Sequence, residues 1–156
     1  MAGSKKSEKQ IKQKFRPEQR KVVQTEDPKA FYSEHPSWNF HTCDNEYWAF
    51  TQEAVGDMLW QEILPHLQEL EKLEWQEIVL QAKKQNHSIE PNGLNKVARD
   101  RLDELNIEAE SLISLRLNGT HRLYGFLVGS VFNILWFDQD HGDNKDCVCR
   151  SYLKHT

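Results

Sequence analysis

The chain has 156 residues, of which 28% are charged, and its mean hydropathy is −0.77. No run of apolar residues approaches the roughly 18 that a membrane span needs, and the N-terminus lacks the apolar stretch of a signal peptide. Three cysteines, an odd number, argue against a disulfide scaffold and favour a reducing compartment. These totals predict a soluble, cytoplasmic protein without a membrane partner, long enough to bury a core.

The net charge of −4 conceals an uneven distribution. Residues 1–29 contain nine Lys or Arg and four Asp or Glu, which leaves 11 basic and 20 acidic residues in the rest of the chain. The first stretch has almost no apolar residues, so we expect a disordered basic arm over 1–29 and one domain over 30–156. The arm could hold an anionic partner or act as a solubilising tail. The acidic body argues against broad binding of a phosphate backbone.

The first part of the domain reads as an edge strand followed by helices. The predicted elements are an edge strand at 36–41, a strand or aromatic loop at 47–50, helices at 51–73 and 75–82, a connector at 87–93, and a helix at 94–105. Thr51 is a candidate N-cap, and Asn106 suits the end of the last helix. Pro65 either kinks the first helix or starts a second one.

Residues 112–141 predict three antiparallel strands in a meander, followed by an acidic loop and a last strand at 147–153. We expect a three-residue first turn with Gly119 in the left-handed conformation, because a two-residue turn would mix the two faces. The second turn predicts the pairs Val128 with Val131, Tyr124 with Leu135, and Leu123 with Trp136.

This register gives the sheet two different faces. The apolar face collects Ile113, Leu115, Leu117, Leu123, Leu127, Phe132, Ile134 and Trp136, and the polar face collects Ser114, Arg116, Arg122, Tyr124, Phe126 and Asn133. The predicted fold class is therefore α+β, with helices packed on one face of a small antiparallel sheet that consists of the C-terminal meander and edge strands.

The polar face carries the first candidate site. Arg116 and Arg122 would be cross-strand neighbours, and two guanidinium groups held together often bind an anion. Either carboxylates of a helix or of the acidic loop neutralise them, or they hold a phosphate. Asp138 and His141, after the last meander strand, suit general acid–base chemistry, but the same residue types are common in structural turns.

Two other patterns carry less weight. His141, Cys147, Cys149 and His155 have zinc-ligand side chains, but C-x-C in a strand lacks the turn that wraps a metal, so we expect no metal site. The aromatic residues Trp38, Tyr47, Trp48, Trp60 and Trp75 could stack on bases, but in a chain of this size we expect them to form core. No cofactor is indicated.

The element order and the segment Ser114–Arg116, Arg122–Tyr124 and Phe132–His141 resemble the RelE/ParE superfamily of bacterial toxins. The wider pattern of Trp38, Trp75, His87, the Ala98–Leu102 helix and the ending Lys154-His155-Thr156 is similar to a bacterial family of uncharacterised proteins with that fold. The resemblance implies a metal-independent endoribonuclease acting on mRNA at the ribosome, with an antitoxin protein as partner.

On this resemblance, Arg116, Arg122 and Lys154 would bind phosphate, while Arg122, Tyr124, His141 and His155 would be the catalytic candidates. Two features depart from the pattern, namely the acidic body and a domain longer than the minimal toxin fold. The alternative is a non-catalytic module that binds a protein partner through the arm or the polar face of the sheet.

Overall fold

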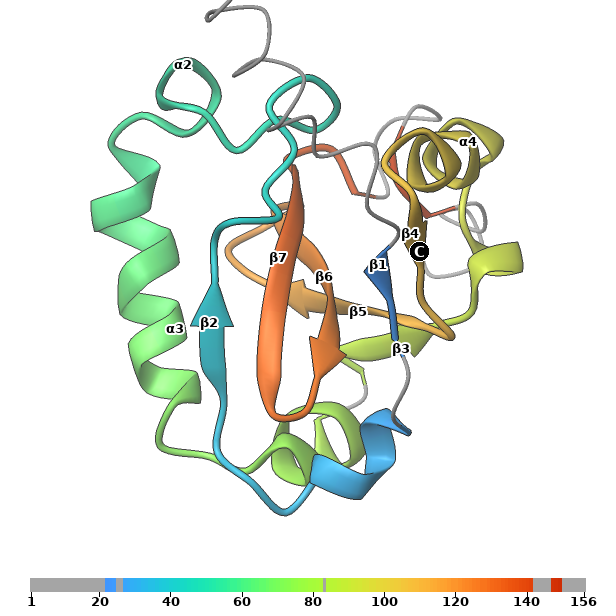
Figure 1. Ribbon diagram of the computed structural model, residues 1–156. Coiled ribbons are helices and arrows are strands. Elements are labelled where there is room, and N and C mark those ends of the chain that lie inside the picture. The colour runs from blue at the N-terminus through green and yellow to red at the C-terminus, as the bar shows by residue number, and fades with distance from the viewer. Residues whose placement is uncertain (1–21, 25–26, 83, 142–146, 150–156) are drawn as a thin grey trace, which may run out of the picture.

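The computed structural model of the protein describes residues 22–24, 27–82, 84–141 and 147–149. A five-stranded sheet lies between two hydrophobic cores, one on each face (Figure 1). In sheet order the strands are β2 (Ser37–Asn39), β7 (Val131–Asp138), β6 (Arg122–Val128), β5 (Leu112–Arg116) and β3 (His87–Ile89). The predicted α+β class and the three-stranded meander are confirmed. The edge strand β2 runs parallel to β7, however, so the sheet is mixed rather than antiparallel.

The first hairpin of the meander has the predicted register. The amide of Leu117 donates to the carbonyl of His121 at 2.9 Å, which closes a three-residue loop. Gly119 lies in this loop at φ 55°, where a side chain would be strained. Arg116 consequently faces Arg122 across the strands, as predicted.

The second hairpin contains a β-bulge that the sequence analysis missed. Val128 pairs with Val131 as predicted, but the register shifts between Tyr124 and Gly125. The observed pairs there are Gly125 with Ile134, Tyr124 with Trp136, and Leu123 with Phe137. Leu135 is the extra residue, so the predicted pairs Tyr124–Leu135 and Leu123–Trp136 are wrong. Because an extra residue turns the following side chains over, Trp136 packs on the opposite face from the one predicted.

Gly125 makes the bulge possible. A Cβ at this position would collide with the carbonyl oxygen of Asn133 and with the ring of Phe132. The two backbones therefore approach more closely here than any residue with a side chain would allow.

The first face of the sheet is covered by a chain of short helices. They are α2 (Gln52–Val55), the π-helical turn η3 (Leu59–Ile63), α3 (Leu64–Leu70) and the π-helical turn η4 (Glu77–Gln81). Thr51 caps α2, since its side chain accepts a hydrogen bond from the amide of Ala54. Pro65 lies in the first turn of α3, as in the second alternative, but α3 continues directly from η3 with Ile63 and Leu64 in the right-handed helical conformation, so the proline marks the change from π-helix to α-helix within one helical stretch.

The opposite face is also covered, by α4 (Lys96–Glu104) and by β1 (Val22–Val23), which pairs in parallel with β4 (Ile107–Glu108) (Figure 1). Tyr124 and Phe126 on this face are completely buried. Helices pack on one face of the sheet as predicted, and α4, which the prediction did not assign to a face, covers the other. Asn106 ends α4 in the left-handed conformation, at φ 55°, as its side chain type suggested.

Four further segments of the chain carried predictions from the sequence. The connector predicted at 87–93 contains the edge strand β3, and residues 47–50 form an aromatic loop. Most of the arm predicted over 1–29 lies outside the described residues, but its described part includes β1 and the start of the 3₁₀ turn η2 (Pro28–Phe31). Of the last strand predicted at 147–153, only residues 147–149 are described, with one bridge from Cys149 to Leu94.

Candidate functional site

Arg116 and Arg122 lie side by side across β5 and β6, at the end of the sheet near the first hairpin turn. Arg116 is exposed and Arg122 is half-buried. The guanidinium of Arg122 donates to the carbonyl oxygens of Gly119 and His121, both at 2.8 Å. Burial lowers the pKa of Arg122, and the positive charge of Arg116 lowers it further. Among the described residues, no ion pair joins either arginine to a carboxylate.

Asp138 occupies the third position in this row, directly across from Arg122 on β7. Its carboxylate is buried, and it accepts hydrogen bonds from the amides of Val148 and Asp140, both at 2.9 Å. Burial nevertheless raises the pKa of Asp138 above the usual range. Its contacts therefore tie the end of β7 to residues 147–149, while its charge offsets part of the repulsion between the arginines.

The next row along the same face brings together His87, Ser114, Tyr124 and Trp136, one from each of β3, β5, β6 and β7. The hydroxyl of Tyr124 lies 3.1 Å from Nδ1 of His141, which follows β7. Burial raises the pKa of Tyr124, and the nearby Asp138 raises it further, so the hydroxyl keeps its proton. A protonated hydroxyl can donate to Nδ1 or accept from its N–H, so in either tautomer the contact fixes the position of the His141 ring.

A pocket of about 410 Å³ opens beside this row. Its lining residues are His87, Ser88, Ile89, Glu90, Asn92, Gly93, His141 and Cys149. His87 and His141 are both half-buried, so each contributes to the wall while remaining in contact with solvent. The pocket therefore brings two imidazoles together, and the strand pair of His87 and Ser114 lies two residues along β5 from Arg116. A larger hollow of about 610 Å³ lies between α4, β1 and β4, but its lining contains no histidine, tyrosine or cysteine.

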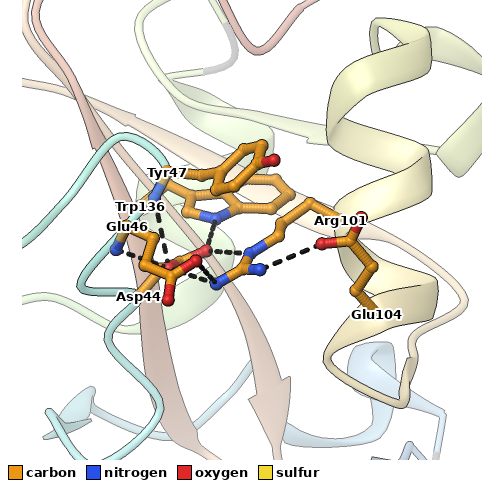
Figure 2. A network of polar contacts seen from close by, with 6 residues as sticks. All are labelled: Asp44, Glu46, Tyr47, Arg101, Glu104 and Trp136. Atoms are coloured by element: carbon orange, nitrogen blue, oxygen red, sulfur yellow. Dashed lines mark hydrogen bonds and ion pairs between the residues drawn. The ribbon is translucent and has the colours of Figure 1, made fainter.

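A third arginine on the same side of the sheet has entirely different surroundings (Figure 2). Arg101 of α4 binds Asp44 through two hydrogen bonds, Nε to Oδ2 at 2.8 Å and Nη2 to Oδ1 at 2.9 Å. Asp44 also accepts from Trp136 Nε1 at 3.0 Å and from the amides of Glu46 and Tyr47. The guanidinium stacks over the ring of Tyr47, 4.4 Å from its centroid, and also pairs with Glu104.

This network is a structural clamp. Burial alone would raise the pKa of Asp44, but hydrogen bonds from Arg101, the backbone and Trp136 outweigh that effect and lower it. The same contacts raise the pKa of Arg101. The charges are mutually neutralised and fully hydrogen-bonded, so the clamp fastens α4 and the loop around Asp44 to the bulged end of β7.

The structure thus brings together some of the site residues predicted from the sequence. The structure brings Arg116, Arg122, Tyr124 and His141 to one end of one face, whereas Lys154 and His155 lie outside the described residues and stay predictions. The sequence analysis gave no role to His87, because it placed the residue in a connector. It also missed the pairing of Asp44 with Arg101, for which the sequence carries no local signal.

The two other sequence patterns were the zinc-type ligands and the aromatic residues. In the described part of the chain, no group of three or more His, Cys, Asp or Glu side chains is arranged to hold a metal ion. Trp75 is completely buried, and Trp38 and Trp48 pack against the cores, which confirms the core prediction for these three. Trp60 is 72% exposed and Tyr47 is 36% exposed, so for them the prediction is wrong.

Comparison of the chain with protein-family models, with curated proteins and with solved structures found no match. Within the described residues, no helix is long and apolar enough to cross a membrane.

Proposed function

We propose that this protein is a RelE/ParE-like toxin, or a relative of one, that cleaves RNA without a metal ion. The observation that supports the proposal most strongly is the cluster at the end of the sheet. Two adjacent arginines, which form no ion pair among the described residues although Asp138 lies across from Arg122, are one row from Tyr124, whose hydroxyl lies 3.1 Å from an imidazole. RNA cleavage needs cations to hold a phosphate and a group that moves protons, and the cluster supplies both.

In this proposal the residues have separate roles. Arg116 and Arg122 hold the scissile phosphate and stabilise the charge that develops on it. His141 exchanges a proton with the ribose 2′-hydroxyl or with the departing 5′-oxygen. Tyr124 is completely buried, so it acts as a positioning residue through Nδ1 of His141. Lys154 and His155 keep their predicted roles as a phosphate ligand and a proton-transfer group.

The products follow from the chemistry of the 2′-hydroxyl. Its oxygen bonds to phosphorus, the bond from phosphorus to the 5′-oxygen breaks, and one proton is removed while another is supplied. The products would be a 2′,3′-cyclic phosphate and a 5′-hydroxyl. The implied partners are mRNA, the ribosome and an antitoxin protein, and the implied location is the cytoplasm. The excess of basic residues in 1–29 would compensate for the acidic body when RNA binds.

The proposal is tested by expressing the wild type, Arg122→Ala and Arg99→Ala, and measuring growth arrest and mRNA cleavage. Arg99 is an exposed arginine of α4, so its substitution makes the same charge change away from the cluster. We expect wild type and Arg99→Ala to arrest growth and to cleave RNA in the presence of EDTA. Arg122→Ala should lose about 100-fold or more of the cleavage rate. Absence of arrest and cleavage by wild type would overturn the proposal.

The second candidate is a non-catalytic module that binds a protein. The observation that favours it is the acidic body, with 20 acidic and 11 basic residues outside the arm. Four of these acidic residues, Asp100, Asp103, Glu108 and Glu110, line the 610 Å³ hollow, against two basic ones, Lys96 and Arg99. Such a surface suits a basic protein segment better than RNA. RNA cleavage by the purified wild type that is lost in Arg122→Ala would exclude this candidate.

A further inference from the structure

We infer that the 410 Å³ pocket holds a nucleotide of the RNA substrate and that His87 is the second proton-transfer residue, opposite His141. The inference rests on the proposed function and extends it to a residue outside the segment that resembles the toxin superfamily. Cleavage through the 2′-hydroxyl moves two protons, one from the nucleophile and one to the leaving oxygen. A single imidazole can serve both steps only in turn, whereas two imidazoles on one pocket serve them together.

The sheet register places His87 on the correct face. His87 pairs with Ser114 across β3 and β5, and Ser114 pairs with Tyr124 across β5 and β6. Directly opposite residues in antiparallel strands project to the same side, so His87 shares the face of Tyr124. Two strand spacings, about 10 Å, separate the backbones of His87 and Tyr124. Tyr124 in turn contacts His141, and both imidazoles line the same pocket.

The order of residues along the face suits a nucleotide. The arginine row lies two residues from the row of His87 along β5, a rise of about 7 Å. Beyond His87, in the direction away from the arginines, β3 continues to Ile89 and then to Glu90 and Asn92 at the far wall of the pocket. A phosphate bound by the arginines would thus have the imidazoles beside it and the pocket beyond them for the attached sugar and base. Asn92 and Glu90 supply the polar groups that a base edge needs.

The other described histidines do not fit this role. Nδ1 of His121 is held by the carboxylate of Glu62 at 2.9 Å, and its ring packs on Phe137 in the opposite core. His66 lies in α3, which covers that same core, and its Nε2 is buried. Neither His35 nor His41 lines the pocket. Of the six histidines in the described residues, His87 is therefore the partner that the geometry provides for His141.

The first test measures how the rate of RNA cleavage depends on pH for wild type, His87→Gln and His35→Gln. With two imidazoles, one neutral and one protonated, the wild-type profile is bell-shaped. We expect His87→Gln to lose one limb of the bell and at least 10-fold of the maximal rate, while His35→Gln keeps both. An unchanged profile and rate for His87→Gln would overturn the inference and leave the proposed function intact.

A second measurement tests nucleotide binding in the pocket independently of RNA cleavage. Uridine 3′-monophosphate is titrated into the full chain while the imidazole signals of His87 and His141 are followed by NMR. We expect both signals to shift, and binding to weaken by about 10-fold in His87→Ala. If both shift although wild type cleaves no RNA, the nucleotide pocket stands and the proposed function fails. Binding that moves neither signal would overturn the pocket itself.

Discussion

Arg101 and Arg122 lie on the same side of one sheet, but their surroundings differ in the one respect that matters for function. Arg101 exposes 11% of its side chain and has Asp44 bound in a two-bonded pair, with Glu104 and Glu46 also in reach. Arg122 is half-buried, donates hydrogen bonds to two backbone carbonyl groups, and lies between a second arginine and Asp138 in the cross-strand row. The pKa of Arg101 is raised by its partners, whereas the pKa of Arg122 is lowered.

The contrast separates an arginine whose charge stabilises the fold from one whose charge remains available to an external anion. A buried guanidinium with a bidentate carboxylate has no capacity left for an external anion. Two partly exposed guanidinium groups repel one another, and that repulsion falls when an anion binds between them. Substitution of Arg101 should therefore lower the stability of the fold. Substitution of Arg122 should instead impair anion binding and catalysis.

The largest effect is expected when the clamp is broken. Arg101→Met keeps the length of the side chain but leaves the carboxylate of Asp44 buried without its cation, so the free energy of unfolding should fall by about 3 kcal/mol. Chemical denaturation followed by tryptophan fluorescence measures this change. The control is Lys96→Met on the same helix, whose ammonium pairs with Asp100 at an exposed site and should cost under about 0.5 kcal/mol. Equal losses in the two variants would contradict the assignment of a clamp.

A smaller effect follows from the pH dependence of the same pair. The pKa of Asp44 is lowered in the folded protein, so the ionised carboxylate stabilises the fold above the unfolded value of about 3.9. This contribution is lost as the pH falls below that value and through the folded pKa. The unfolded state is the same in both proteins, so the difference in stability between wild type and Arg101→Met depends on the folded pKa of Asp44 in each. Burial without the guanidinium raises that pKa in the variant, so the difference should be largest near pH 7 and shrink as the pH falls. Denaturation series at several pH values measure it, and a difference that does not change down to pH 3 would exclude the pair as its source.

The same two regions show what the sequence could and could not predict. The pairing of Arg116 with Arg122 follows from Gly119, because a left-handed residue in a three-residue loop fixes the register of a hairpin locally. The clamp joins residues 57 positions apart, and neither Asp44 nor Arg101 has a local pattern that points to the other. The register of a hairpin can be predicted from residues close together in the sequence. A pair of residues far apart in the sequence depends instead on how α4 packs.

The β-bulge could be predicted from the sequence only in part. Gly125, in the middle of a strand, was a signal for close backbone approach, but the sequence does not say which residue of the partner strand is extra. That one residue decides whether Trp136 joins the helix-covered core or reaches Asp44, as it does. The prediction of an open polar face failed for a related reason. The pattern of β6 showed Tyr124 and Phe126 on one side, but not that α4 and β1 bury them.

The smallest effect is expected at the other arginine, and it completes the comparison. Arg122→Met loses two hydrogen bonds to carbonyl groups, of which the one on His121 still accepts from the amide of Leu117, and it removes a positive charge from beside the buried Asp138. It also removes the repulsion from Arg116. These changes oppose each other, so the free energy of unfolding should change by less than about 1 kcal/mol in either direction. The measurement is the same denaturation series used for Arg101→Met. A loss near 3 kcal/mol would mean that Arg122 serves the fold as Arg101 does, and the loss of RNA cleavage in Arg122→Ala would then reflect misfolding rather than a missing phosphate ligand.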